Sequence, residues 1–117
     1  MFQTSYFSSK APRGRKVCIA KWAPRGWTGP RAPKLAPSNP KALNWREAYL
    51  ADLEERFPQG ADLWEYLWEI ARQTPFPILC CYESDPAQCH RRILADYVKK
   101  WLGDDIPEWN GNQASLI

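Results

Sequence analysis

Most of the side chains that could do chemistry lie in one short stretch of the sequence. Two thiols, a carboxylate, the only imidazole and a guanidinium group come from Cys81, Glu83, Cys89, His90 and Arg91. Thiols, carboxylates and imidazoles serve as nucleophiles and acid–base groups, and guanidinium groups bind anions. We therefore predict a pocket for an anionic, nucleotide-like or phosphorylated ligand. Its catalytic candidates are Cys81, Glu83, Cys89 and His90, and Arg91 is its first ligand-binding candidate.

In an enzymatic version of this pocket, Cys89 or Cys81 would be the nucleophile, or Glu83 would be the acid–base group. His90 would move a proton and Arg91 would hold the anion. A binding protein would use the same pocket without a reaction, and the sequence does not decide between the two. Several enzyme classes lack their motifs here. The chain has no Cys followed six positions later by Arg, no Gly-rich phosphate loop, no dinucleotide fingerprint and no Pro-Cys-x-x-Cys of zinc deaminases.

Other interpretations of the same residues stay open. A zinc site could use Cys81, Cys89 and His90, with Glu83 or Cys80 as its fourth ligand. We nevertheless expect no metal or other cofactor, because neighbouring residues point about 100° apart on a helix and the paired spacings of zinc motifs are absent. The two sulfurs of Cys81 and Cys89 could form a reversible disulfide. In a purely structural interpretation, the cysteines are small core residues and the arginines pair with acids.

Charge is divided unevenly along the chain. The formal net charge is +3, but residues 1–46 contain ten basic and no acidic side chains, whereas residues 47–117 contain six basic and thirteen acidic ones. A basic half favours an anionic partner, although the two halves could also neutralise each other. We take Lys21, Arg25 and Tyr6 as further ligand-binding candidates. We also expect the basic loop and the start of the last helix to face one cleft.

A second function is indicated by basic and aromatic residues that alternate in the N-terminal half. Such residues stack bases and neutralise phosphates along a single nucleic-acid strand. They are Trp22, Arg25, Trp27, Arg31, Lys34, Lys41, Trp45 and Arg46. The alternative function is therefore a single-stranded nucleic-acid-binding module, and a phage-type accessory protein that acts by protein contact is a third. Alternatively, the aromatic rings pack the loop against the domain.

Short strands and amphipathic helices must position these residues. Apolar and β-branched stretches predict strands, apolar residues at helical spacing predict helices, and a segment with five prolines and two glycines excludes both. The expected strands are 4–7, 16–22, 76–82 and a short one at 105–108; the expected helices are 45–57, 61–73 and 86–102; and the Pro-rich loop is 23–40. The third strand lacks alternation, as in a strand buried on both faces of a parallel sheet.

Local signals mark the helix ends. The pair Asn44 and Glu47 predicts an N-terminal cap for the first helix. The run 85–88 predicts that the third helix starts there, which places Cys89 in its first turn, and Gly103 predicts its end. Residues expected in the core include Trp64, Trp68, Cys18 and Cys80.

These elements predict an α/β sandwich with a mostly parallel sheet of three or four strands and about three helices, whose ligands bind beyond the carboxyl ends of the strands. We expect a single domain at 1–109 and a flexible C-terminal tail at 110–117. No secretory signal is present and the longest apolar run is only five residues, 78–82, so we expect a soluble, cytoplasmic protein without membrane contact.

The string Cys-x-Glu-x5-Cys-His-Arg, from Cys81 to Arg91, is followed by an amphipathic helix and by Ile106-Pro107-Glu108. With Thr4-Ser5-Tyr6-Phe7, the strand that leads into Pro24, and Leu35-Ala36-Pro37, it resembles the compact branch of the domain-of-unknown-function 488 family, whose members are small bacterial, archaeal and phage-borne proteins. The resemblance implies a small Rossmann-like three-layer sandwich with the signature residues around one pocket. It implies no settled reaction.

Overall fold

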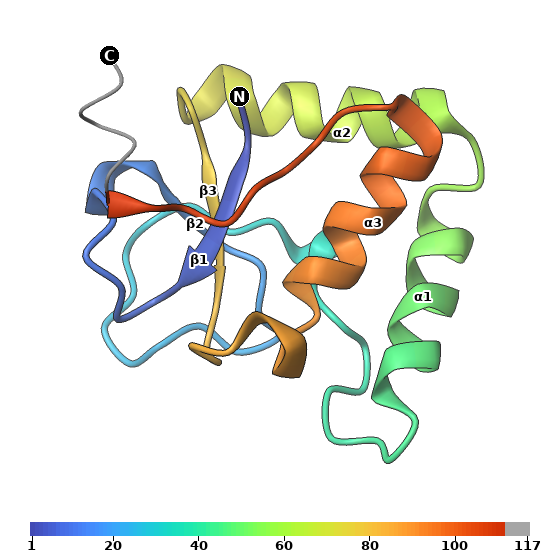
Figure 1. The fold of residues 1–117 in the computed structure, drawn as a ribbon, viewed down its shortest axis with the longest axis horizontal. Coiled ribbons are helices and arrows are strands. Elements are labelled where there is room, and N and C mark those ends of the chain that lie inside the picture. Colours follow the sequence, from blue (N-terminus) through green and yellow to red (C-terminus); the bar gives the residue numbers. More distant parts are fainter. Residues whose placement is uncertain (112–117) are drawn as a thin grey trace.

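Three short strands and three α-helices form the regular structure of residues 1–111, the part of the chain that the computed structural model describes (Figure 1). The strands are β1 (Gln3–Tyr6), β2 (Lys16–Cys18) and β3 (Ile78–Cys81). The helices are α1 (Trp45–Arg56), α2 (Gly60–Gln73) and α3 (Arg91–Leu102). Most of the predicted tail, residues 112–117, lies outside the described residues. Among the described helices, none is long and apolar enough to cross a membrane.

The strands form an all-parallel sheet in the order β1-β3-β2. In its register, Cys80 of the central strand lies between Ser5 of β1 and Cys18 of β2. All four residues of β3 are buried, which confirms the prediction of a strand with apolar side chains on both faces. β2 is shorter than predicted. The last predicted strand is reduced to a single parallel bridge between Thr4 and Glu108.

The helices pack on one face of this sheet. Side chains alternate along a strand, so Leu79 and Cys81 join the buried residues of α1, α2 and α3, whereas Ile78 and Cys80 point the other way. The opposite face is covered by side chains from outside the helices: Phe7, Ala11 and Trp109. The α/β class and the parallel sheet are confirmed. The third layer of the predicted sandwich, however, consists of loop residues instead of helices.

The apolar faces of α1 and α2 supply much of the core. Leu53 of α1 is fully buried, as its spacing predicts, and α2 buries Leu63 and Leu67. Trp64 and Trp68 are 55% and 52% exposed, so their predicted place in the core is wrong. Each lies one residue, about 100° of helix rotation, beyond a buried leucine. The two indoles therefore lie on the flank of α2.

The Pro-rich loop of residues 23–40 is held against α1 by hydrogen bonds. The Tyr49 hydroxyl donates to the backbone oxygen of Leu35 at 2.6 Å. The backbone N–H and the hydroxyl of Ser38 both donate to the Asp52 carboxylate, at 2.8 Å. The loop is thus a fixed wall beside the sheet.

The third helix starts five residues later than predicted. The Asp85 carboxylate does cap a turn by accepting from the Ala87 N–H at 3.0 Å, but that turn is a short 3-10 helix, Pro86–Gln88. Cys89 then returns to extended backbone (φ −131°), and α3 begins only after His90. Cys89 and His90 are therefore not in a helical turn. The angle of about 100° between neighbouring helix residues, which argued against a shared metal ion, does not apply to them.

The other helix-end predictions have mixed outcomes. At the start of α1, Asn44 stands at the N-cap, but its side chain makes no capping hydrogen bond within the described residues, so the predicted capping pair with Glu47 is wrong. Gly103 ends α3 in the left-handed conformation (φ 75°), as predicted.

Gly103→Ala tests this C-cap. An added Cβ would meet nothing within 4 Å, so the substitution adds only backbone strain. We expect the free energy of unfolding, measured by urea denaturation, to fall by about 1–2 kcal/mol. Gly14→Ala is the matched control, since its Cβ also enters open space and its φ is not positive. Its expected change is within about 0.5 kcal/mol, and equal losses in both variants would refute the strain argument.

Candidate functional site

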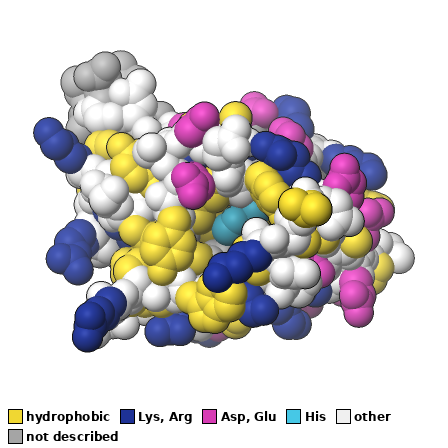
Figure 2. Space-filling view, turned by 90° about the horizontal axis from the view of Figure 1, so that it is seen from below, with side chains coloured by type: hydrophobic (Ala, Val, Ile, Leu, Met, Phe, Trp, Pro, Cys, Tyr) yellow, Lys and Arg dark blue, Asp and Glu magenta, His cyan; other side chains and the backbone are white. Residues whose placement is uncertain are grey.

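A cavity of about 450 Å³ opens where the carboxyl ends of β2 and β3 meet. One wall comes from the residues after β2, the end of the Pro-rich loop and the start of α1, and the other comes from the segment after β3. The lining includes Lys21, Trp22, Lys41 and Trp45 on the first wall, and Tyr82, Glu83 and His90 on the second. Figure 2 shows this end of the molecule, where basic and hydrophobic side chains surround the single imidazole. The segment before α3 therefore shares a cleft with Pro37 and Pro40 of the Pro-rich loop. The basic residues of that loop, Arg25, Arg31 and Lys34, do not line it, so the expectation of one shared cleft is confirmed only in part.

Three of the predicted catalytic residues form a buried cluster at this cavity. The sulfur atoms of Cys81 and Cys89 and a ring nitrogen of His90 all lie within 4.8 Å of one another. The two cysteines are joined as a disulfide, with their Cα atoms 7.1 Å apart. Cys81 ends β3, and Cys89 lies in the extended segment before α3. The structure thus brings together the residues of the alternative metal set.

The His90 imidazole is neutral at physiological pH. Its Nε2 atom lies 2.7 Å from the Ile19 backbone oxygen, and the ring packs edge-on against Tyr49. Burial lowers the pKa of His90 to about 4, because the charged ring would lose its hydration. A carbonyl oxygen can only accept, so Nε2 carries the proton. The lone pair is therefore on Nδ1, which lies 3.7 Å from the Cys89 sulfur.

The other two cysteines are core residues, as predicted. Cys18 and Cys80 are both buried, and Cys80 faces the sheet side opposite the cluster. Burial raises the pKa of both thiols, that of Cys80 to about 12. These thiols stay protonated and carry no reactive charge.

The structure places Arg91 inside the protein, where we predicted a ligand-binding group. Its side chain is 0% exposed. Nε donates to both carboxylate oxygens of Glu108 at 3.1 and 3.0 Å, Nη1 donates to the Cys81 sulfur at 3.2 Å and to the Glu83 backbone oxygen, and Nη2 donates to the Ser84 backbone oxygen at 3.1 Å. All three guanidinium nitrogens are thus bonded to protein groups. Arg91 positions the loop after β3 and does not line the cavity.

The remaining predicted residues divide into two groups. Glu83 and Lys21 are exposed and line the cavity, and the Lys21 ammonium donates to the Ser38 backbone oxygen at 2.7 Å. Arg25 and Tyr6 are not among the residues that line this cavity. The Tyr6 ring lies 6.0 Å from the Arg91 guanidinium carbon, so its contact is with the buried arginine.

Several lining residues were not among the site candidates, and Trp22 is one of them, since it was assigned only to the nucleic-acid alternative. Lys41 and Trp45 were assigned only to the nucleic-acid alternative, although both line the cavity beside His90. Tyr82 lies inside the chemical string, and its hydroxyl donates to the Trp22 backbone oxygen at 2.7 Å, which joins the two walls. The sequence signal that could have identified Tyr82 as a site residue was its position directly after a buried strand. For Lys41 and Trp45 the signal was the excess of basic and aromatic residues.

Residues 16–98 match a protein family that is described as "Domain of unknown function DUF488". The chain belongs to the DUF488 family. This confirms the resemblance seen in the sequence, and the matched region contains the whole cavity lining. No curated protein and no solved structure matches the chain.

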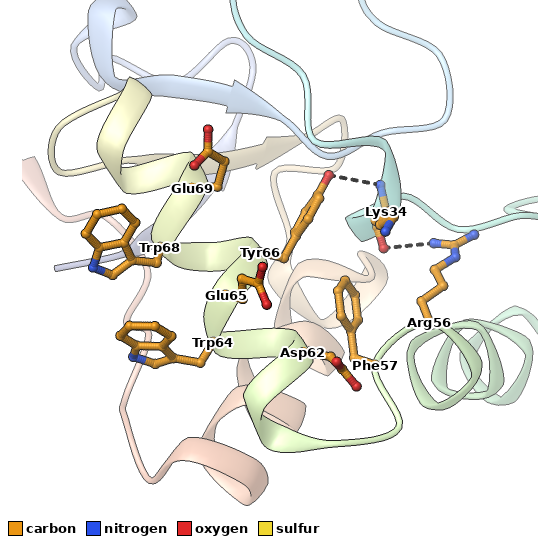
Figure 3. A pocket seen from close by; sticks show the side chains of 9 residues that line it. All are labelled: Lys34, Arg56, Phe57, Asp62, Trp64, Glu65, Tyr66, Trp68 and Glu69. Carbon is orange, nitrogen blue, oxygen red and sulfur yellow. Dashed lines mark hydrogen bonds between the residues drawn. The ribbon is translucent and has the colours of Figure 1, made fainter.

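A larger cavity of this DUF488 protein, about 620 Å³, runs along α2 (Figure 3). Asp62, Glu65 and Glu69 line it opposite Lys34 and Arg56. None of the predicted site residues lines it, and its three carboxylates oppose an anionic ligand. For these reasons we place the candidate site of this DUF488 protein in the smaller cavity at the carboxyl end of the sheet.

Proposed function

We propose that this DUF488 protein binds a nucleotide-like anionic ligand in the cavity at the carboxyl end of the sheet. The observation that supports the proposal most strongly is that basic and aromatic side chains from either end of the Pro-rich loop meet the polar segment after β3 around one cavity. In α/β proteins, ligands bind beyond the carboxyl ends of parallel strands. The volume of about 450 Å³ lies within the range of roughly 300–1,000 Å³ for small-molecule sites.

Two ammonium groups provide the attraction for an anion. The Nζ atoms of Lys21 and Lys41 lie 5.2 and 5.5 Å from the centre of the Trp22 ring. Within the described part of the chain, neither ammonium forms an ion pair with a carboxylate. Two like charges around one ring repel each other. A phosphate group bound between them would replace this repulsion with two attractions.

Aromatic side chains provide a surface for a base. Trp22 is 54% exposed at the cavity and Tyr82 is 52% exposed, and the hydrogen bond from Tyr82 to the Trp22 backbone fixes their spacing. Stacking of a base on an aromatic ring contributes about 1–3 kcal/mol. Exposed rings beside two cations match the base and the phosphate of one nucleotide.

The roles of the remaining cavity residues are less specific. The neutral His90 ring cannot attract the anion by charge, and the Glu83 carboxylate opposes one at the rim. The catalytic roles assigned to Cys81, Glu83, Cys89 and His90 stay predictions. The proposal is therefore one of binding.

Single-strand binding has weaker support. A strand of nucleic acid needs a continuous track of aromatic and basic groups. Trp27 instead packs against Phe7 at 5.3 Å and donates to the Pro30 backbone oxygen. Lys34 lines the separate cavity along α2. The basic and aromatic residues are thus divided between different surfaces.

A ligand screen tests the proposal. Nucleoside mono-, di- and triphosphates and sugar phosphates are added to the purified protein in a thermal-shift assay, and binders are titrated by calorimetry. We expect at least one nucleotide to bind. We expect Trp22→Ala to weaken it by about tenfold, since it removes a stacking surface.

The matched control is Trp64→Ala. Trp64 is as exposed as Trp22, at 55%, but lies on α2 away from the cavity. Its loss should leave the affinity unchanged. A protein that binds no nucleotide at millimolar concentration, or one that both substitutions weaken equally, would rule out this site.

A further inference from the structure

We propose that Cys81, Cys89 and His90 of the reduced protein bind one thiophilic divalent cation, of which Zn²⁺ is the representative, through the two sulfurs and the imidazole Nδ1. This site lies in the wall of the nucleotide cavity but does not depend on nucleotide binding. Cysteine thiolates and neutral imidazoles are the ligands that zinc prefers.

The spacing of His90 Nδ1 and the Cys89 sulfur fits a tetrahedral ion, and the two sulfurs, which are bonded in the disulfide, can reach the roughly 3.8 Å that such an ion needs only after reduction. Metal–sulfur and metal–nitrogen bonds of about 2.3 and 2.1 Å place two such ligands roughly 3.6 Å apart across a tetrahedral ion. Nδ1 of His90 lies 3.7 Å from the Cys89 sulfur, and all three atoms lie within 4.8 Å of one another. All three residues are buried, so the site lies within the protein and not on its surface.

The tautomer of His90 is already the one that a metal needs. Nε2–H donates to the Ile19 backbone oxygen at 2.7 Å, which leaves the lone pair on Nδ1, on the side of the sulfurs. Histidines that bind metals commonly donate their other ring N–H to a backbone carbonyl in this way, because the bond fixes the ring. The imidazole is thus oriented as a ligand by a group outside the cluster.

A positive group also faces the first sulfur. Arg91 Nη1 donates to the Cys81 sulfur at 3.2 Å. A thiolate carries a full negative charge and accepts such a bond far better than a disulfide sulfur does. The arginine therefore matches the deprotonated, metal-bound form of Cys81.

The backbone distance between Cys81 and Cys89 favours a metal ion shared by the two sulfurs over a disulfide bond between them. The Cα atoms of Cys81 and Cys89 are 7.1 Å apart, beyond the range of about 4.4–6.8 Å that is usual for disulfides. Two cysteines that share an ion need no such approach. Three protein ligands leave one position of a tetrahedral ion, and the three residues line the cavity, where Glu83 or a small molecule could fill it. Cys80 cannot, because it faces the opposite side of the sheet.

The disulfide and the metal site exclude each other. A dithiol reductant such as dithiothreitol gives two electrons and two protons to the disulfide, which becomes two thiols while the reductant becomes a cyclic disulfide. Binding of the cation to the two thiols then releases those two protons. Metal loading therefore requires the reduced protein.

Cobalt(II) titration tests the site. The protein is reduced with dithiothreitol, desalted without oxygen and titrated with Co²⁺, which gives intense visible bands and a sulfur-to-metal charge-transfer band when thiolates hold it tetrahedrally. We expect one Co²⁺ per chain with both signatures, displaced by one equivalent of Zn²⁺. Cys81→Ala and Cys89→Ala should each abolish the charge-transfer spectrum or reduce the affinity at least 100-fold, and His90→Gln should reduce the affinity at least tenfold.

Cys80→Ala is the matched control, since it removes the neighbouring thiol of the same strand on the other face of the sheet, and it should keep the spectrum. Circular dichroism shows whether each variant is folded. Cys81 and Cys89 lie on different segments, so if one of the two cysteine variants does not fold, the other still tests the site. Reduced, folded protein that binds no Co²⁺, or binds it without the charge-transfer band, would overturn the proposal. So would equal loss of the band in Cys80→Ala.

Discussion

Arg91→Ala is expected to lower the free energy of unfolding by about 3 kcal/mol, the largest effect of any single substitution considered for stability. The guanidinium is fully buried, and it pairs with Glu108 while its other donors hold the loop after β3. Its removal leaves a cavity, backbone oxygens without a donor, and a Glu108 carboxylate whose remaining ion pair is the longer one to Arg92. Glu108 is 31% exposed, so part of its charge is hydrated, which places the loss at the low end for a broken buried ion pair.

Two comparison variants make this prediction specific. Arg91→Lys keeps the charge, but a single ammonium cannot reach acceptors on three sides, so we expect it to recover only a small part of the loss. Arg92→Ala removes an arginine that is 34% exposed and also pairs with Glu108, at 3.6 Å, and it should cost about 1 kcal/mol. Urea denaturation measures all three. If Arg91→Ala and Arg92→Ala cost the same, Arg91 is not the central residue of this network.

The second large effect concerns ligand binding. Replacing both Lys21 and Lys41 by Glu is expected to weaken the affinity for a nucleoside monophosphate at least 100-fold. Each lysine lost removes a charged contact of about 1.5–3 kcal/mol, and each glutamate adds repulsion. Calorimetry measures the affinity. A loss below about threefold would mean that the phosphate lies elsewhere.

The double substitution Lys99→Glu and Lys100→Glu is the matched control. It changes the net charge by the same amount, but these lysines lie in the last turn of α3, outside the cavity. We expect an effect below about threefold at physiological salt, where distant exposed charges are screened. Equal losses in both double variants would indicate that net charge alone attracts the ligand.

Elements whose signals are local could be predicted from the sequence. The uninterrupted apolar run of β3, the buried leucine spacing of α2 and the stop at Gly103 each depend on a few neighbouring residues, and the structure confirms them. The position of Trp64 on the flank of α2 depends on how α2 packs against α3. The spacing of apolar residues in the sequence does not determine that orientation. The missing helical layer likewise depends on how loop residues cover the second face of the sheet.

The start of α3 shows how a non-local contact overrides a local signal. Asp85 and the residues after it do form a capped turn, as their types predict. The chain then leaves the helical conformation at Cys89, and Arg91 pairs with Glu108, which comes seventeen residues later. No spacing rule connects Arg91 to that partner. This is why its residue type indicated anion binding while the structure assigns it a positioning role.

The part of the candidate site that comes from neighbouring residues could also be predicted from the sequence. Cys81, Cys89 and His90 come from one short stretch, so their proximity follows from the turn that joins a buried strand to a helix. Lys41 and Trp45 reach the cavity only because α1 holds the long loop beside the sheet.

A crystal structure of the protein with adenosine monophosphate tests nucleotide binding in this cavity most directly. We expect density for the nucleotide in the cavity at the carboxyl end of the sheet, with the base on Trp22 or Tyr82 and the phosphate within hydrogen-bond distance of Lys21 or Lys41. Density along α2, beside Trp64 and Glu65, or a cavity that stays empty while the nucleotide binds in solution, would contradict it.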